Sequence, residues 1–578
     1  MKISASLVSG FTGIKTESKP YRLAVLGDSA TQLLVKTLTR EGQAWGGGLE
    51  IFESDINQID HMVRNPNSDL YVFSPEAVLL LYSAEELQKQ YYAANHRIGE
   101  QFVSDKITEI RQIVSCLKAD AVGRKIIVSN YAEINDGVYG NNANKYRASF
   151  LSSLRRINIA LMDMVEGDSS VYILDLALMQ SRIGRSKLFD PRLYVTSSMV
   201  YSVEALPVIA RNIIEILASV QGNARKCLIL DLDNTIWGGV IGDDGVEKIE
   251  LGELGIGKAF TRIQRWAKEL RSRGILLAVC SKNSDEIAKE PFLKHPDMEL
   301  RLEDISIFIA NWDDKVTNIR YIQSMLNIGF DSMVFIDDNP FERELVKSAL
   351  PEVAVPDLPD DPAEYMDFLQ ELNLFEAGTL SDLDADRTLM VQRGIETRQL
   401  QSKFENEGDF LQNLNMICKV SGFNNFNTPR VAQLSERSNQ FNLRTIRYSE
   451  QEVRAISQNP DFAGMAFSLE DRLGDHGLIS AVVLSQKGSS LFIDNWFMSC
   501  RVLKRGVEHV VLDKIICLAI ARGCEVVVGE YIPTRKNGLV SNHYENLGFH
   551  SRADDGLWVL PVTDFIKVEH FIEVVRHD

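Results

Sequence analysis

The stretch that decides the fold of this chain is CLILDLDNTIWGGVIGDDG, which runs from Cys227 to Gly245. An apolar run leads into two acids spaced one residue apart, Asp231 and Asp233, and a glycine-rich run follows. The run predicts a buried strand of a parallel sheet, and open α/β sheets carry their sites at the carboxyl ends of such strands. Two carboxylates there can hold a hard cation, or one can attack phosphorus while the other exchanges a proton. A capping Asp beside a turn Asp is the structural alternative.

Three later segments place polar residues at the end of a strand or the start of a helix. They are VCSKN with Ser281 and Asn283, NWDDKVTNI with Lys315, and FIDDNPFER with Asp337 and Asp338. A hydroxyl, an amide and a cation beside free helix N–H groups can bind phosphate oxygens, and carboxylates are hard ligands for a metal. The four pieces in this order favour phosphate chemistry over a pair of capping acids.

This set resembles the haloacid dehalogenase (HAD) superfamily of phosphoryl-transfer enzymes. The resemblance implies that Asp231 is the nucleophile and Asp233 the general acid/base, and that Mg²⁺ is the cofactor. It implies a phosphate site made of Ser281, Asn283 and Lys315. The metal ligands that it implies are Asp231, Asp233, Asp337 and Asp338.

The spacing of these pieces predicts a HAD domain without a cap. The chain between Asp233 and the predicted helix Gly257–Arg273, and between Ser281 and Lys315, is too short to hold a folded domain. WGGVIGDDG is then a short flap. An open site suggests a large substrate, or one delivered on a protein arm.

The composition is that of a globular protein of a reducing compartment. Of 578 residues, 45% are hydrophobic and 25% charged, and the net charge is −18. This charge argues against non-specific binding to nucleic acid or to an anionic membrane. Seven cysteines without paired spacing do not indicate a disulfide framework, and no apolar run reaches membrane-spanning length. We expect a cytoplasmic protein with no nucleic-acid partner and no membrane insertion.

Residues 1–222 alternate short apolar runs with amphipathic segments, which predicts βαβ units and a parallel sheet. The predicted strands are RLAVLGDS (Arg22–Ser29), DLYVFS (Asp69–Ser74), KIIVSNY (Lys125–Tyr131) and SVYILDL (Ser170–Leu176). Phe102–Leu117 and Ala148–Val165 are predicted helices between them.

GDSA at Gly27–Ala30 and Asn130, each placed after a strand, resemble the SGNH hydrolases, which implies a flavodoxin-like α/β domain. Those enzymes also need a His in an Asp-x-x-His near the end of the domain. The matching place here has Asp190 but no His, and His96 is the last His of this region. Ser29 therefore lacks its usual base. We expect an inactive, structural or carrier-docking domain, with Ser29 as an active nucleophile the alternative.

From residue 406 the pattern changes to mixed helix and antiparallel strand, and Gly477–Ser499 predicts a hairpin. This hairpin, RVLKRGVEH and NHYENLGF (Asn542–Phe549) resemble the GNAT acyltransferase fold. The resemblance implies that Gly506, with Arg505 beside it, binds donor phosphates at a helix start. Glu508 replaces the next glycine of the family, which favours a phosphopantetheine arm over free coenzyme A.

A hairpin turn that begins at Lys487 would bring His476 opposite Ser499, one residue from Cys500. A thiol beside an imidazole is the pair that nucleophilic acyl transfer needs. A buried Cys and a His that satisfies the strand end are the structural alternative, and a β-bulge would shift the register. Cys280 is the rival thiol, although strand alternation points it into the core, where we expect it to pack.

The HAD and GNAT-like units together, with RSNQFNLRTIRYS and GDHGLIS, closely resemble the FkbH-like family over residues 226–549. The resemblance implies transfer of a glyceryl unit from 1,3-bisphosphoglycerate to the phosphopantetheine thiol of an acyl carrier protein, with loss of phosphate, through an enzyme thioester. Two alternatives stay open. One is a Mg²⁺-dependent phosphatase of a sugar or glycerol phosphate fused to a coenzyme A-dependent N-acyltransferase of surface-glycan assembly. The other is a non-catalytic scaffold for carrier proteins.

We thus expect an α/β protein with four parts: an SGNH-like domain (1–222), a capless HAD Rossmann-like domain (223–375), a helical linker (376–405) and a GNAT-like α+β domain (406–578). Carrier proteins are usually acidic, so docking on this acidic chain needs a local basic face. Its candidate residues are Arg501, Lys504, Arg505, Arg522, Arg535 and Lys536. A solvated helix face is the alternative.

Overall fold

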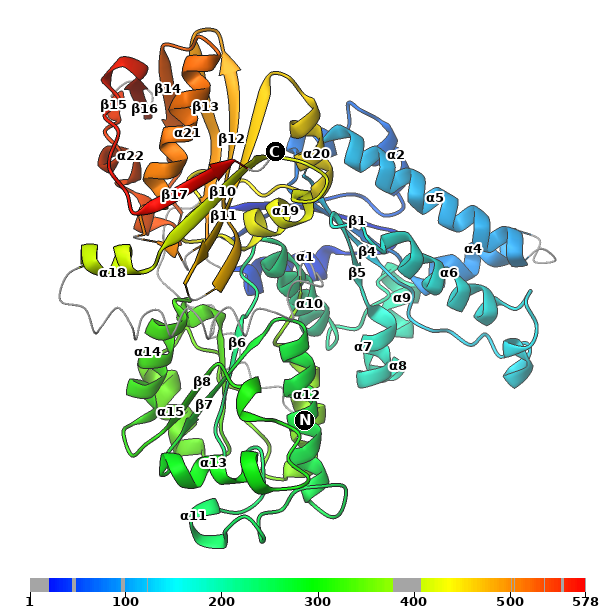
Figure 1. Cartoon of the computed structure of the whole chain (residues 1–578). Coiled ribbons are helices and arrows are strands. Elements are labelled where there is room, and N and C mark those ends of the chain that lie inside the picture. The colour runs from blue at the N-terminus through cyan, green and yellow to red at the C-terminus, as the bar shows by residue number, and fades with distance from the viewer. Residues whose placement is uncertain are drawn as a thin grey trace. The chain divides into compact units, whose positions relative to one another are not determined.

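The structure of the chain is a computed structural model. It describes residues 20–43, 48–94, 99–121, 123–377, 407–472, 474–499, 502–503, 505–534, 536–552 and 556–576. The chain divides into two compact units, one built mainly from residues before 221 and one from the residues that follow. Figure 1 labels the helices and strands. None of the described helices is long and apolar enough to cross a membrane.

The first unit is built on a five-stranded parallel sheet of order β2-β1-β3-β4-β5. Its strands are β1 (Tyr21–Gly27), β2 (Leu49–Glu53), β3 (Ala77–Leu81), β4 (Lys125–Ser129) and β5 (Val171–Leu174). Its helices are α1 (Gln32–Gly42), α2 (Ile59–Arg64), α3 (Asp69–Phe73), α4 (Ala84–Ala93), α5 (Gly99–Asp120), α6 (Phe150–Val165), α7 (Leu176–Ile183), α8 (Arg185–Leu188), α9 (Pro191–Ser197) and α10 (Leu206–Val220). Leu23 and Val25 of β1 belong to the core with α1 and α10, and Ala24 and Leu26 to the core with α5 and α6. Helices therefore cover both faces of the sheet, as parallel strands require.

The prediction of a strand over Asp69–Ser74 is wrong. Most of that segment is the helix α3, which ends where Ser74 adopts a left-handed conformation with φ of 50°. The strand is instead the apolar run AVLLL of β3, in which every residue is buried. This run lies only three residues after α3, so the apolar pattern of the two segments is ambiguous without the fold. The edge strand β2 was also missed, since its half-exposed LEIFE carries a weaker signal.

The second unit begins with a four-stranded parallel sheet of order β8-β7-β6-β9. Its strands are β6 (Cys227–Leu230), β7 (Leu276–Ser281), β8 (Ile307–Ala310) and β9 (Met333–Ile336). Its helices are α11 (Ile241–Asp244), α12 (Gly257–Ser272), α13 (Asp285–Lys294), α14 (Lys315–Leu326), α15 (Pro340–Ala349) and α16 (Tyr365–Glu371). The strand order reverses direction at β6, between β7 and β9. A crevice at the carboxyl ends of the strands is expected at such a switch point.

The rest of the second unit is an eight-stranded, mostly antiparallel sheet of order β15-β16-β14-β13-β12-β11-β10-β17. Its strands are β10 (Met416–Gly422), β11 (Phe462–Asp471), β12 (Gly474–Lys487), β13 (Ser490–Met498), β14 (Val526–Glu530), β15 (His550–Arg552), β16 (Leu557–Pro561) and β17 (Ile572–Arg576). Its helices are α18 (Glu407–Asn413), α19 (Thr428–Arg437), α20 (Glu450–Gln458), α21 (Val507–Ala521) and α22 (His543–Asn546). Helix α21 packs into one core of this sheet, and α19 and α20 into another. The predicted fold class, an α/β protein with two parallel sheets followed by an α+β sheet, is confirmed.

The predicted pairing of His476 with Ser499 is wrong, although the hairpin of β12 and β13 is present. The turn lies one residue later than expected, at Gly488 and Ser489, and Gly488 has φ of 62°. A register shift within the hairpin adds one more residue. The backbone N–H of Ser499 therefore donates to the carbonyl of Ile479 at 2.8 Å, three residues beyond His476.

Candidate active site

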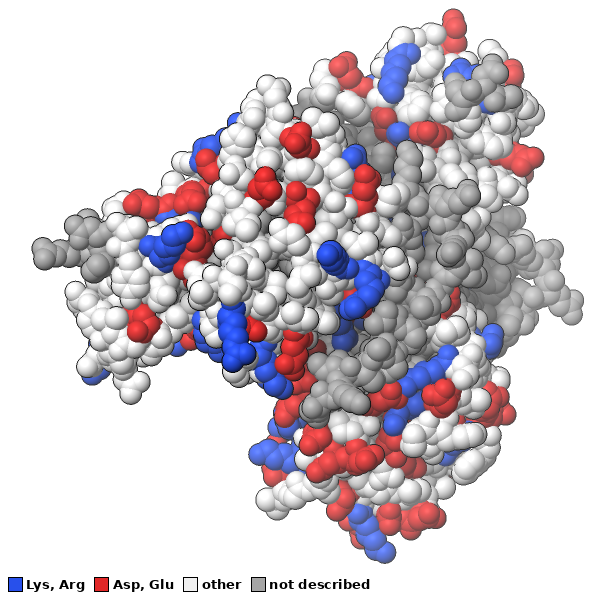
Figure 2. Space-filling model, turned by 180° about the vertical axis from the view of Figure 1, so that it is seen from behind, with Lys and Arg blue, Asp and Glu red and all other residues white. Residues whose placement is uncertain are grey.

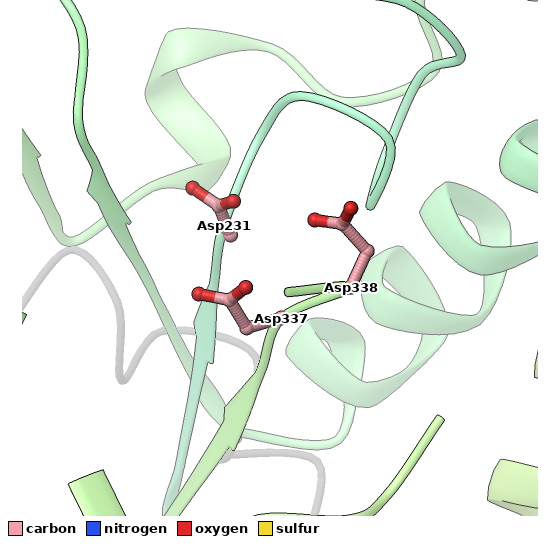
Figure 3. A group of neighbouring side chains, drawn as sticks. All are labelled: Asp231, Asp337 and Asp338. Carbon is pink, nitrogen blue, oxygen red and sulfur yellow. The ribbon is translucent and has the colours of Figure 1, made fainter. Parts of the chain in front are cut away.

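Three carboxylates meet at the carboxyl edge of the β6–β9 sheet. Asp231 follows β6, and Asp337 and Asp338 follow the neighbouring strand β9. One oxygen of each side chain lies within 4.8 Å of the others. Figure 3 shows the three side chains from two adjacent strands around one common space. Asp231 and Asp337 are buried, and Asp338 is partly exposed. The sequence therefore predicts this convergence correctly from strand ends alone.

Lys315, the first residue of α14, is buried among these acids. Its Nζ lies 3.0 Å from Oδ1 of Asp231 and contacts Asp337. Although burial lowers the pKa of Lys315, the two carboxylates raise it above the ordinary value, so the side chain stays an ammonium. Burial and the charge of Asp231 raise the pKa of Asp337 to about 6 and also raise that of Asp338. One ammonium thus faces three acids, and the excess is negative charge.

The residues of this group fit a hard divalent cation. Oδ1 of Asp231 is buried, and Nζ of Lys315 lies 3.0 Å from it. Carboxylate oxygens are the ligands that Mg²⁺ prefers, and a cation here would relieve the repulsion among the acids. Asp231, Asp337 and Asp338 are the residues that could hold it.

Asp233 does not belong to this group, contrary to its predicted role as a metal ligand. Its Oδ1 accepts hydrogen bonds from Nε1 of Trp237 at 2.8 Å and from the N–H of Ile241 at 3.0 Å. Its Oδ2 accepts one from Nδ2 of Asn283 at 3.3 Å. Burial raises its pKa in spite of these donors. A carboxyl with a raised pKa suits proton exchange better than metal binding.

The glycine-rich run is a short flap fixed to the sheet edge. Trp237 is fully buried and meets Phe292 edge-on, with ring centroids 6.0 Å apart. Oδ1 of Asn234, itself at φ of 54°, accepts a hydrogen bond from the N–H of Gly239 at 2.9 Å. Gly239 has φ of 91°, a conformation that glycine adopts without strain. The flap thus holds Asp233 through its indole and backbone and forms no separate domain.

Ser281, the last residue of β7, and Asn283, two residues beyond it, are buried at the same sheet edge as Asp231, because β6 and β7 are adjacent parallel strands. Cys280 points the other way, into the core, and its Sγ lies 3.9 Å from the carbonyl of Lys315. Burial raises the pKa of this thiol, which disfavours the thiolate. Packing is therefore the role that its position supports, and it is a poor candidate for the acyl-carrying thiol.

Thr235 is a site residue that the sequence reasoning missed. It is fully buried, its Oγ1 donates to Oδ1 of Asp338 at 3.3 Å and accepts from the N–H of Asp338 at 3.1 Å. The hydroxyl thus ties the loop after β9 to the loop after β6. The sequence carries a signal for this residue, because Thr235 lies between the two acids and the glycine-rich run.

Arg505 and Gly506, predicted to bind donor phosphates, lie in the turn before α21. Gly506 caps α21 with φ of 84°. Arg505 is buried, however, and its NH1 lies 2.7 Å from Oδ2 of Asp471, so this cation points into the protein. A phosphate would find Glu508 in the first turn of α21. The structure therefore does not support a phosphate-binding role for Arg505.

The predicted basic face is not formed by its described members. Arg505 binds Asp471, and NH2 of Arg522 donates to the carbonyl of Phe462 at 3.1 Å. Nζ of Lys536 lies 2.7 Å from Oδ2 of Asp331. Three further candidates, and the predicted thiol, lie outside the described residues: Arg501, Lys504, Arg535 and Cys500. In Figure 2, Lys and Arg are interspersed with Asp and Glu among the residues drawn in colour.

The chain itself fills the opening between β13 and β14. Their pairing ends at Ile493 and Gly529, and beyond it the segment Phe441–Arg444 pairs with β13. The N–H of Leu443 donates to the carbonyl of Trp496 at 3.1 Å, and the carbonyl of Leu443 accepts from Ile532 at 2.9 Å. Where two neighbouring strands diverge, their unpaired backbone N–H and C=O groups can form hydrogen bonds with the amides of an extended ligand. Here these groups of β13 are already used.

The hydrolase-like residues of the first unit are not assembled into a catalytic set. Oγ of Ser29 is buried without a hydrogen-bond partner. Asn130 donates from Nδ2 to Oδ1 of Asp175 at 2.7 Å and accepts from the N–H of Ala177 at 3.1 Å, so it holds the start of α7. Asp190 caps α9. That this domain is inactive or structural stays a prediction.

Comparisons with known proteins identify the family. The family model "FkbH, N-terminal domain" matches residues 22–218. The N-terminal part of the protein BF1531 from Bacteroides fragilis, described as containing a phosphatase domain complexed with Mg, is 42% identical. The match covers 65% of this chain and 98% of that chain, with a TM-score of 0.60. The chain belongs to the FkbH-like family.

This FkbH-like chain also matches GNAT structures over about a quarter of its length. The ribosomal-protein-S18-alanine N-acetyltransferase from Escherichia coli is 16% identical over 25% of this chain and 94% of its own, with a TM-score of 0.20. The GNAT domain of S. lividans PAT is 17% identical over 24% of this chain and 87% of its own, with a TM-score of 0.21. No curated protein matched the sequence.

Proposed function

We propose that this FkbH-like protein is a Mg²⁺-dependent phosphatase joined to an acyltransferase. It takes a glyceryl unit from 1,3-bisphosphoglycerate, releases phosphate, and loads the unit onto the phosphopantetheine thiol of an acyl carrier protein. The observation that carries the proposal is the group of Asp231, Asp337 and Asp338 around Lys315. The Mg-bound relative, 42% identical, supports the choice of metal.

In this proposal the acids and Lys315 act on the phosphate ester. Asp231, Asp337 and Asp338 would hold the metal, which supplies positive charge to the phosphate oxygens. Asp231 attacks phosphorus, and Asp233 gives a proton to the leaving alkoxide and then takes one from the hydrolytic water. Lys315 neutralises the phosphate as its charge shifts to the transferring oxygens. The flap keeps Asp233 oriented.

The acyl half of the reaction needs no further activation, since the donor is a mixed anhydride. An enzyme thiolate attacks the carbonyl carbon, the bond to the phosphate oxygen breaks, and inorganic phosphate leaves. The thiol of the carrier then displaces the enzyme sulfur. We propose Cys500 as the enzyme thiol, because the rival Cys280 is buried with a raised pKa.

The coenzyme A-dependent alternative has less support. Arg505 points into the protein, Glu508 occupies the first turn of α21, and the segment Phe441–Arg444 takes the backbone groups of β13. A carrier-bound arm lacks the adenosine phosphates, so it does not need the cation that Arg505 would otherwise supply. The scaffold alternative leaves the convergence of the acids unexplained.

The test is to incubate the protein with 1,3-bisphosphoglycerate, Mg²⁺ and a holo-carrier protein, and to follow the carrier mass and released phosphate. We expect a carrier of glyceryl mass that forms only with Mg²⁺ present. Asp231→Asn should stop hydrolysis of the phosphate ester while leaving acyl uptake intact. Loading of the carrier from an acyl-coenzyme A, with none from 1,3-bisphosphoglycerate, would contradict the proposal.

A further inference from the structure

Helices α7, α8 and α9 of the first unit carry a group of exposed cations. Figure 1 shows the three short helices next to one another. Residues 176–198, which contain them, include four cations and one acid, although the net charge of the whole chain is −18. One of the cations, Arg185, binds the buried Glu85, with 2.8 Å between its NH2 and Oε1. The other three are exposed and form no ion pair with any residue that the structure describes: Arg182, Lys187 and Arg192.

Exposed apolar side chains accompany these cations. On α7, Leu178 lies four residues before Arg182, and this spacing places the two side chains on one face of a helix. On α9, Val195 lies three residues after Arg192, which has the same consequence. Leu178 is 44% exposed and Val195 is 81% exposed. The surface that these side chains form is called the cationic face below, and its members are Leu178, Arg182, Lys187, Arg192 and Val195.

Capped helix ends hold the cationic face in place, and acids lie at its border. Oδ1 of Asp190 accepts a hydrogen bond from the N–H of Arg192 at 2.8 Å and so caps α9. Asp175 caps α7 at the end opposite to Arg182. Glu204, which is exposed, follows α9 in the sequence. At about 0.15 M salt the Debye length is about 8 Å, so a docked partner senses the charges of the face more than the distant acids of the chain.

We propose that the cationic face docks the acyl carrier protein through acidic side chains on the carrier. This inference rests on the proposed function. Cations beside exposed apolar groups suit a folded protein, because interfaces combine an apolar centre with a polar rim and complementary charge steers the encounter. Three cations can neutralise about three phosphates, whereas a nucleic-acid-binding protein can make about 6–10 such contacts. An acidic protein therefore fits the face better than nucleic acid does.

The first test compares the KM of a holo-carrier protein with the KM of free pantetheine as acceptors of the glyceryl unit. Pantetheine offers the same thiol without the acidic protein. The triple variant R182E/K187E/R192E should raise the KM of the carrier about 10-fold or more and leave that of pantetheine within about twofold. The matched control reverses three exposed cations elsewhere in the first unit and should leave both values within about twofold: Lys36→Glu, Arg111→Glu and Lys145→Glu.

One substitution at the border of the face should act in the opposite direction. Glu204→Lys should lower the KM of the carrier, because it removes a charge that repels an acidic partner. A triple variant that keeps the wild-type KM for the carrier, or that raises the KM of pantetheine equally, would overturn the proposal.

The second test measures binding itself, by fluorescence anisotropy of labelled holo-carrier with the full chain. The affinity of the wild-type protein should fall as salt rises, and an affinity that salt does not change would overturn the proposal even if the triple variant does not fold. Carrier binding that the triple variant loses, in a protein whose wild type loads no acceptor, would support the face and refute the proposed function. Wild-type binding to duplex DNA or anionic vesicles, with none to the carrier, would refute carrier docking.

Discussion

Asp338→Asn should stabilise the metal-free protein while it weakens metal binding. Oxygens of Asp338 and Asp231 lie within 4.8 Å. Two unit charges about 5 Å apart repel by about 3 kcal/mol at an effective dielectric constant of 20 and by less than about 1 kcal/mol in water. Asp338 is partly exposed, and the variant also loses an attraction to Lys315. We therefore expect a net gain of about 1 kcal/mol in the free energy of unfolding.

Asn has nearly the same shape as Asp, so the substitution removes the charge of residue 338 without changing the packing of the site. The amide oxygen can still accept the hydrogen bond that Thr235 donates to Asp338. The assay is thermal unfolding of the full chain in EDTA and in rising Mg²⁺. About 1 kcal/mol corresponds to a rise of roughly 2–4 °C for a domain of this size. With one carboxylate fewer, the increase in melting temperature that Mg²⁺ causes should be smaller.

The pH dependence of stability tests independently whether the charge of Asp338 destabilises the metal-free protein. The pKa of Asp338 is raised above 3.8 in the folded protein, so the folded state holds this proton more tightly than the unfolded state. Without metal, the wild type should lose stability relative to Asp338→Asn as pH rises from 3.8 through the raised pKa. Asp313→Asn, which removes an exposed charge, is the control. A variant that melts lower than wild type in EDTA, with an unchanged response to Mg²⁺, would refute the reasoning.

Three further outcomes are expected. Lys315→Met should abolish phosphate release and cost about 3–5 kcal/mol by denaturant unfolding in EDTA, because it leaves buried acids unpaired; an unchanged midpoint would contradict this. Ser29→Ala should leave carrier loading and the free energy of unfolding unchanged, because its hydroxyl has no hydrogen-bond partner. Asn130→Ala should lower the free energy of unfolding by about 1–3 kcal/mol, because its hydrogen bonds are lost. Equal stability of the two variants would argue against a structural role of Asn130. Gly529→Ala should lower the free energy of unfolding by about 1–3 kcal/mol through overpacking, since the new Cβ would lie 2.3 Å from the ring of Tyr544. Unfolding curves that coincide with those of the wild type would disprove the close packing.

The acidic site could be predicted because strand ends impose it. Once CLIL and MVFI are neighbouring parallel strands, the residues that follow them, Asp231 and Asp337, must meet at one edge. The sequence could not show that donors outside the acidic group engage both carboxylate oxygens of Asp233. That depends on donors from Trp237 and Ile241, which reach Asp233 only because the flap folds back on the sheet.

The acyltransferase half was harder to predict, because sheet register depends on single residues. The turn lies one residue later than predicted, which moves the pairing by two positions, and one register shift moves it by a third. A separate register shift, between β11 and β12 at Gly477, accompanies the contact of His476 with Asp471, which lies five residues away in sequence. The two register shifts have no periodic signature, since each is an insertion into a regular pattern.

The central claim is most directly tested by the intact mass of the protein after incubation with 1,3-bisphosphoglycerate and Mg²⁺, without a carrier. We predict an adduct of glyceryl or phosphoglyceryl mass on the wild type and on Cys280→Ala, because Cys280 is buried with a raised pKa. The adduct should be absent from Cys500→Ala. Phosphate release with no adduct on any of the three proteins would contradict acyl transfer through an enzyme thiol.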